Sequence, residues 1–168
     1  KIDSLTDEQS EKAIEEPAKK FNIIYAHEAI NKIVEITKGS PFFIQQLCKI
    51  VYDKTNKDVI ELSDVENCID EFLSSLDERF FKSRYERCAE SDKKFIFAMV
   101  ECGELPCTIS NVAHNLNKTV GSISTTRAQL ISKGIIYPVR YKELDFTVPE
   151  FSGYIQRLEE YKQWCISK

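Results

Sequence analysis

The sequence predicts a mainly α-helical protein in which a helical bundle is followed by a winged helix-turn-helix with a small antiparallel β-hairpin. Apolar residues recur at helical spacing throughout the first half of the chain. Between Thr108 and Gly134, two short helical patterns follow one another so closely that the helices must cross at a steep angle. Two extended runs of β-branched and aromatic residues then lead to Pro149. We predict two domains, residues 1–88 and residues 89–168.

The first domain is expected to consist of helices alone. Thr6 and Gln9 form a capping-box pair that opens a short helix, which Pro17 is expected to end or kink. The next apolar stripe ends at Gly39, a typical helix stop.

Two further helices are predicted in this domain. Ser40 is expected to cap the first of them, with Pro41 at its first position. Ser63 and Glu66 form a second capping box, beyond which an apolar stripe continues as one long helix. The polar residues 84–94 are expected to link the two domains and to act as a hinge.

The second domain is predicted to begin with a helix over residues 92–101. Thr108 is expected to cap the first helix of the helix-turn-helix, which ends at Asn117 because asparagine tolerates the left-handed conformation. Thr119 caps the second helix and Gly134 stops it. The apolar residues expected to face inward from this second helix are Val120, Ile123, Leu130 and Ile131.

A β-hairpin follows the second helix. Residues 135–139 are predicted as one strand and residues 144–148 as the returning strand, with residues 140–143 at the tip. Pro138 has no N–H to donate to a neighbouring strand, so its strand is expected at the edge of the sheet. Pro149 opens a final helix with an apolar stripe of its own.

Composition favours a soluble, globular protein of the cytoplasm. The chain has 168 residues, of which 42% are hydrophobic and 30% are charged. It contains no apolar run near the ~20 residues that cross a membrane, and no signal-peptide pattern. The spacings of its six cysteines match no zinc motif, so we expect free thiols in a reducing compartment and no metal site.

The charge is unevenly distributed along the chain. Residues 1–89 contain 13 Lys and Arg against 18 Asp and Glu, whereas residues 90–168 contain 10 against 9. The second half is therefore close to neutral. Because non-specific DNA affinity depends on counterions released by Lys and Arg, this balance predicts that such affinity is weak.

The second helix of the helix-turn-helix exposes small polar residues suited to a DNA groove, and basic residues flank it and form part of the hairpin tip. The candidate DNA-binding residues are Lys118, Thr119, Ser122, Thr125, Arg127, Gln129, Lys133, Arg140 and Lys142. Two other interpretations remain open. The same surface is typical of a solvated helix face with scattered charge, and winged helices also dock proteins.

No catalytic centre is predicted in this chain. It has no Gly-x-x-x-x-Gly-Lys-Ser/Thr run to hold phosphates and no acidic strand end to hold magnesium. Neither His27 nor His114 has a partner nucleophile or carboxylate cluster. We therefore expect that the chain alone does not hydrolyse ATP.

Three segments carry a resemblance to a known family. They are Thr-Lys-Gly-Ser-Pro-Phe-Phe-Ile-Gln-Gln-Leu-Cys at residues 37–48, Leu-Ile-Ser-Lys-Gly-Ile-Ile-Tyr at residues 130–137, and Phe-Thr-Val-Pro-Glu-Phe at residues 146–151. In this order they resemble the C-terminal half of archaeal and bacterial ATPases of the AAA+ superfamily, which are similar to STAND signalling ATPases and archaeal origin-recognition initiators. The resemblance covers nearly the whole chain, although the hairpin tip lacks the glycine usual in the family.

The resemblance implies that a helical lid and a winged helix follow a nucleotide-binding domain. It also implies that Gly39, Ser40, Pro41 and Phe42 lie near the nucleotide bound by that preceding domain. From the residues alone, Gly39, Ser40 and Pro41 form an ordinary helix stop followed by a helix start. Phe42 packs either on an adenine or on the preceding domain.

The resemblance implies that the chain is a non-catalytic C-terminal part of a longer ATP-binding protein. Its start at Lys1 rather than at methionine agrees with this expectation. The lid would couple nucleotide state to a winged helix that binds double-stranded DNA or a protein partner. No cofactor is expected in this chain, whereas ATP and magnesium are expected for the whole protein. The alternatives are a free-standing transcriptional regulator with a helical dimerisation half, and a protein-docking scaffold.

Overall fold

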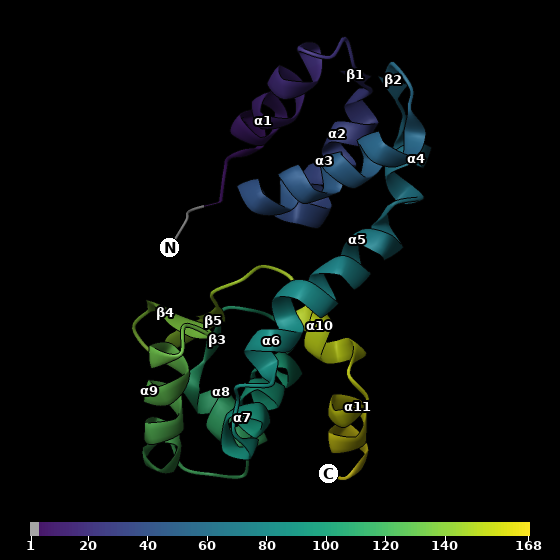
Figure 1. Cartoon of the computed structure of the whole chain (residues 1–168). Coiled ribbons are helices and arrows are strands. Elements are labelled where there is room, and N and C mark those ends of the chain that lie inside the picture. Colours follow the sequence, from purple (N-terminus) through teal and green to yellow (C-terminus); the bar gives the residue numbers. More distant parts are fainter. Residues whose placement is uncertain (1–3) are drawn as a thin grey trace. The chain divides into compact units, whose positions relative to one another are not determined.

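The chain divides into two compact units, with the boundary between Asp77 and Glu78 (Figure 1). The structure is a computed structural model and describes residues 4–168. Both units are mainly helical, and the second contains a three-stranded antiparallel sheet, so the predicted fold class is confirmed. Residues 78–88, which the sequence analysis assigned to the first domain, pack within the second unit.

The first unit is a helical bundle with one short pair of parallel strands. Its elements are α1 (Asp7–Lys19), β1 (Ile24–Tyr25), α2 (His27–Thr37), α3 (Pro41–Thr55), β2 (Val59–Ile60), α4 (Leu62–Glu66) and α5 (Ile69–Leu76). Ile33, Phe43, Leu47 and Phe72 are almost completely buried. They belong to α2, α3 and α5, so the predicted apolar stripes of these helices supply the core of this unit.

The beginning of α1 matches its prediction and its end does not. Thr6 and Gln9 form the expected capping box, with the Gln9 N–H donating to Thr6 Oγ1 at 3.3 Å. Pro17 does not end α1, because the helix continues to Lys19, and the alternative of a kink stays a prediction. Ala18 is buried in that last turn. Packing of this turn therefore outweighs the one backbone hydrogen bond that a proline removes.

Two other predicted helix starts need correction. Pro41 occupies the first turn of α3 as expected, but the Ser40 side chain makes no capping hydrogen bond. The predicted pair Ser63 and Glu66 does not cap a helix. Instead, the carboxylate of Asp64 accepts from the backbone N–H of Glu61 at 2.9 Å. Glu61 and Asp64 therefore start α4 at Leu62, earlier than a cap at Ser63 would. The predicted long helix is interrupted between α4 and α5.

The second unit has the element order of a winged helix-turn-helix. After the π-helical turn η1 (Asp77–Phe81), its elements are α6 (Lys82–Tyr85), α7 (Glu90–Glu101), β3 (Cys107–Thr108), α8 (Ile109–Asn115), η2 (Gly121–Ile123), α9 (Ser124–Ser132), β4 (Ile136–Arg140), β5 (Glu143–Phe146), α10 (Phe151–Arg157) and α11 (Glu159–Ile166). Helix, strand, two helices and a hairpin thus follow one another from α7 to β5.

The sheet of the second unit has the order β3-β5-β4, with antiparallel pairing throughout. The predicted position of Pro138 on an edge strand is therefore confirmed. Pro138 lies opposite Leu144, and a register irregularity follows between Pro138 and Arg140. Strand β3 was not predicted, because two residues carry no alternating pattern that the sequence would reveal.

Aromatic side chains fill the interior of the second unit. The Phe81 ring lies 5.7 Å from that of Phe151 and 5.5 Å from that of Tyr154. Tyr85 is buried between Phe97 and Tyr154, with ring centroids 6.3 and 6.1 Å away. The prediction that residues 84–94 form a polar linker and hinge is therefore wrong, because this segment contributes to the core.

Two smaller predictions in this unit are also wrong. The final helix is interrupted at Leu158, whose extended backbone (φ −70°, ψ 134°) separates α10 from α11. This break allows both Phe151 in α10 and Trp164 in α11 to reach aromatic partners. Val120 does not face inward but is 43% exposed, because the turn before η2 lies at the surface.

Candidate nucleic-acid interface

Local hydrogen bonds set the geometry of the helix-turn-helix. Thr108 Oγ1 accepts a backbone N–H at the start of α8 at 3.2 Å, and Asn117 takes the left-handed conformation after that helix (φ 52°). Thr119 Oγ1 accepts from the Ser122 N–H at 3.3 Å, which starts η2. Gly134 ends α9 with φ 68°. The predicted Thr108 cap and the stops at Asn117 and Gly134 are confirmed, whereas the second helix begins as the short 3₁₀ turn η2 and becomes α-helical only at Ser124, without a side-chain cap of its own.

The outer face of η2 and α9 is built from small and uncharged side chains. Ile123 and Leu130 are buried and hold this segment on the unit. The exposed residues of the segment are Gly121, Ser122, Ser124, Thr125, Ala128, Gln129 and Ser132. Such short side chains allow a helix backbone to come close to another molecule, and their hydroxyl and amide groups can hydrogen-bond to base edges or phosphates.

The segment that forms this surface contains no acidic residue. Residues 105–142, from the loop before β3 to the hairpin tip, include five Lys and Arg and no Asp or Glu. Since 27 of the 168 residues are acidic, a segment of this length at the average composition would contain about six. This absence of acidic residues is visible in the sequence. The charge totals of residues 1–89 and 90–168 hide it, because each total includes acidic neighbours.

Charge also separates the two structural units more sharply than the two predicted domains. Residues 1–77 contain 9 Lys and Arg against 16 Asp and Glu, a formal charge of −7. Residues 78–168 contain 14 against 11, a formal charge of +3. The second unit is therefore moderately basic, and its only long acid-free segment is the one that carries α9, β4 and the turn after it, ending before Glu143 in β5.

The predicted basic residues fall into two groups. Lys118, Arg140 and Lys142 are exposed. Arg127 is half-buried, and its Nε is covered without a hydrogen-bond partner in the described part of the chain. Lys133 is held in an ion pair with Asp92. Three of the five cations are therefore freely available to a ligand.

The ion pair of Lys133 joins the end of α9 to the start of α7. Asp92 is fully buried, and its Oδ2 accepts from the Ala89 N–H at 3.0 Å and from Lys133 Nζ. Hydrogen bonding to this carboxylate raises the pKa of Lys133 above its usual value. Lys133 Nζ also donates to the Arg87 carbonyl at 3.4 Å. These contacts give Lys133 a structural role within its unit.

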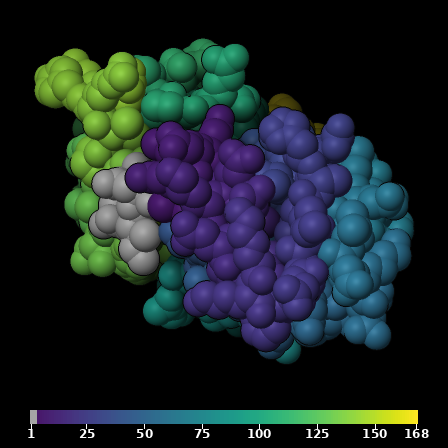
Figure 2. All heavy atoms as spheres, turned by 90° about the horizontal axis from the view of Figure 1, so that it is seen from above, coloured from purple at the N-terminus to yellow at the C-terminus, as the bar shows by residue number. Residues whose placement is uncertain are grey.

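The hairpin has a tight tip that is tied to the rest of the unit. Arg140 lies opposite Glu143 in the register of β4 and β5, which leaves Tyr141 and Lys142 as a two-residue turn. Lys142 adopts the left-handed conformation (φ 64°) in place of the missing glycine. Its carbonyl accepts from the Ile109 N–H at 2.9 Å. The tip, yellow-green in Figure 2, projects from the surface of its unit.

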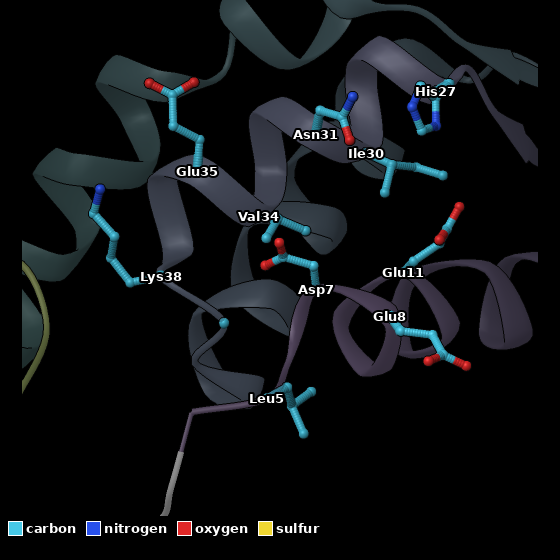
Figure 3. Close-up of a pocket in the computed structure, with 11 residues that line it drawn as sticks. Leu5, Asp7, Glu8, Glu11, His27, Ile30, Asn31, Val34, Glu35 and Lys38 are labelled. Atoms are coloured by element: carbon cyan, nitrogen blue, oxygen red, sulfur yellow. The ribbon is translucent and has the colours of Figure 1, made fainter.

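A pocket of about 710 Å³ lies beside Gly39 in the first unit (Figure 3). Its lining comes from the chain before α1, from α1 and from α2. The charged residues of the lining are Asp7, Glu8, Glu11, Glu35 and Lys38. Four carboxylates against one ammonium group make this pocket unsuitable for a phosphate group on its own.

The backbone before α1 explains the glycine at position 39. Gly39 is buried with φ +70°, and its carbonyl accepts from the Leu5 N–H at 2.8 Å. A Cβ at this position would lie 2.5 Å from the Leu5 carbonyl oxygen. The neighbouring Ser40 and Pro41 are half-buried, and Phe42 is 47% exposed. Their predicted proximity to a nucleotide remains a prediction.

Within residues 4–168, no group of three or more His, Cys, Asp and Glu is arranged to hold a metal ion. In the same part of the chain, the helices are too short or too polar to span a membrane.

Comparisons with known proteins give a partial match. Residues 78–155 match the family described as Domain of unknown function (DUF8462). A search of curated proteins finds no match. Among solved structures, the Thermotoga maritima RuvB Holliday junction branch migration motor is 17% identical with a TM-score of 0.40, covering 92% of this chain and 50% of that chain. A mutant of the same protein gives 17% identity, a TM-score of 0.41 and coverages of 93% and 50%.

The chain therefore spans half the length of the solved structures that it matches. The family match lies wholly within the second unit, and its description states no function.

Proposed function

We propose that the second unit binds double-stranded nucleic acid, with η2 and α9 entering a groove and the hairpin contacting the backbone. The observation that carries this proposal is the acid-free segment 105–142. A polyanion is repelled by carboxylates, so a surface from which they are absent over this length suits phosphate groups. The acidic residues of the chain are concentrated elsewhere, and most of them lie in the first unit.

The arrangement of side chains supports separate roles along this surface. Ser122, Thr125 and Gln129 are exposed and uncharged, which suits contact with base edges. Lys118 lies before η2, and Arg140 and Lys142 lie at the hairpin tip, so basic residues border the polar face in sequence on both sides. Such contacts with phosphates fix the position of a protein on a duplex without reading its sequence.

The test is the salt dependence of duplex binding, measured by fluorescence anisotropy with the full chain. Three available cations predict that log Kd rises with log salt with a slope of roughly 3, since each phosphate contact contributes about 0.9. Lys118→Met should lower the slope by about 1. Lys162→Met is the control, because Lys162 is in α11 and pairs with Glu159 at 2.6 Å. Binding that is absent or insensitive to salt would refute the proposal.

We further propose that the chain is the lid and winged-helix part of an AAA+-type ATP-binding protein. The proposal rests on the segments of family resemblance and on the order of a helical unit before a winged helix. The acidic pocket beside Gly39 implies that cationic groups for ATP phosphates must come from a preceding domain. ATP should therefore not bind this chain alone, whereas it should change the DNA affinity of the full-length protein. Unchanged DNA affinity with ATP would contradict the coupling.

A further inference from the structure

Tyr141 is exposed to solvent although it carries a large aromatic ring. It is 87% exposed, whereas Tyr25, Tyr85 and Tyr154 are each less than a tenth exposed. It stands at the tip of the hairpin rather than on a broad face. A large aromatic ring held out in solvent gains little from burial within its own chain, so its face is available to stack on a ligand.

The backbone presents this ring on a fixed support. The adjacent Lys142 carbonyl accepts a hydrogen bond from the Ile109 N–H. The next residue, Glu143, lies opposite Arg140 in β4 and opposite Thr108 in β3. The turn is thus fastened to β3, β4 and the first residue of α8. Fixing such a tip on binding costs little conformational entropy, because its backbone is already ordered.

One cation lies against the ring and another precedes it in the chain. Lys142 Nζ lies 5.0 Å from the Tyr141 ring centroid, within the range of a cation–π contact. Arg140 precedes the tyrosine and is exposed. Within residues 4–168, neither Arg140 nor Lys142 takes part in an ion pair. The tip therefore offers one aromatic face together with two available positive charges, and the half-buried Glu143 follows Lys142.

This combination selects among the possible ligands. An acidic peptide would satisfy the cations but not the ring. The interior of a duplex offers phosphates, but its bases are stacked on one another and present only their edges in the grooves. An unpaired nucleobase offers an open π-face beside a phosphate, and aromatic side chains stack on such bases in single-strand binding proteins.

We propose that Arg140, Tyr141 and Lys142 bind an unpaired base that adjoins a duplex. The Tyr141 ring stacks on the base, and the two cations contact the flanking phosphates. This inference rests on the proposed function, because η2 and α9 must hold the adjoining duplex. The preferred substrate class is accordingly a duplex with a single-stranded extension rather than a blunt duplex.

The experiment compares a blunt duplex with the same duplex carrying a four-nucleotide single-stranded extension, using the full chain and fluorescence anisotropy. The wild-type chain should bind the extended duplex about five- to a hundredfold more tightly, as expected for one stacked base. An extension whose first nucleotide is abasic should lose most of this preference. A 2-aminopurine at that position should lose fluorescence on binding, which reports stacking directly.

Variants separate stacking from general affinity. Tyr141→Ala should abolish the preference for the extended duplex, whereas Tyr141→Phe should retain it. Tyr52→Ala, which removes a half-exposed tyrosine of the first unit, is the matched control. Because Tyr141 is so exposed, Tyr141→Ala should also unfold at the same urea concentration as the wild type.

The possible failures are distinguishable. Equal affinity of the wild type for both substrates, with normal salt dependence, would overturn the stacking inference and leave the duplex-binding proposal intact. An equal loss of affinity for both substrates in Tyr141→Ala would also overturn it. Absence of salt-sensitive binding to either substrate would overturn the proposed function itself.

Discussion

Replacing Lys133 with methionine should destabilise the second unit by about 2–3 kcal/mol. Methionine keeps much of the apolar length of lysine but removes the ammonium group from the buried Asp92. Breaking a buried ion pair by removing one partner costs about 3–5 kcal/mol. Lys133 remains 37% exposed, so water screens its side of the pair, and the loss should lie at or just below the lower end of that range.

Urea unfolding followed by tryptophan fluorescence measures this loss in the second unit alone. Trp164 is the only tryptophan of the chain, and its ring packs 5.6 Å from that of Phe97. With an m-value of about 1 kcal/mol/M for a unit of this size, the midpoint should fall by about 2–3 M. Lys118→Met is the control, because Lys118 is exposed and should leave the midpoint almost unchanged.

Alkaline pH provides a second check on the same ion pair. The folded-state pKa of Lys133 is raised above 10.5, so its stabilisation is fully present below that pH and is lost as pH rises through the raised value. The difference between the wild type and Lys133→Met should therefore shrink at higher pH. Equal midpoints for Lys133→Met and Lys118→Met at neutral pH would refute the structural role of Lys133.

Two further predictions concern the first unit. Gly39→Ala should destabilise it by about 2–4 kcal/mol, since the residue has a positive φ and the new Cβ would overlap a backbone oxygen. Gly121→Ala, with no atom within 4 Å of the new Cβ, should change stability by less than about 1 kcal/mol in the same thermal circular-dichroism assay. The second prediction is a pH effect: the hydrogen bond from Lys57, together with the N–H of Glu61, holds the pKa of Asp64 below its usual 3.8. Its stabilisation is therefore present above pH 3.8 and lost as pH falls through the lowered value, so Lys57→Met should begin acid unfolding at a higher pH; an unchanged acid midpoint would count against this cause.

Features that depend on a few neighbouring residues could be predicted from the sequence. Thr108 and Thr119 start helices because each hydroxyl accepts an N–H only three residues away. Gly134 stops α9 because glycine takes a positive φ at little cost. The edge position of Pro138 follows equally from its own missing N–H. In each case the determining chemistry lies within one turn or one residue.

Features that depend on distant partners could not be predicted in the same way. Tyr85 belongs to a polar stretch, and only its contact with Tyr154 shows that this stretch joins the core. Lys133 was predicted to contact DNA, but Asp92, 41 residues earlier in the chain, holds its ammonium group. No local pattern connects these positions.

The candidate interface shows the same division. The exposure of Thr125 and Gln129 followed from helical spacing. The absence of acidic residues from 105–142 was also visible in the sequence, but a comparison of halves divided at residue 89 averaged this segment with acidic neighbours. The prominence of Tyr141 required the hairpin geometry, because a tyrosine in a polar segment has no characteristic pattern.

The contact between Leu5 and Gly39 sets a limit on how far the chain can be shortened from its beginning. A version starting beyond residue 5 would leave the Gly39 carbonyl without its N–H donor and uncover a glycine that has no side chain to shield the start of α3. Proteolytic trimming that removes these few amino acids should therefore loosen the junction of α2 and α3, although it takes away no part of either helix.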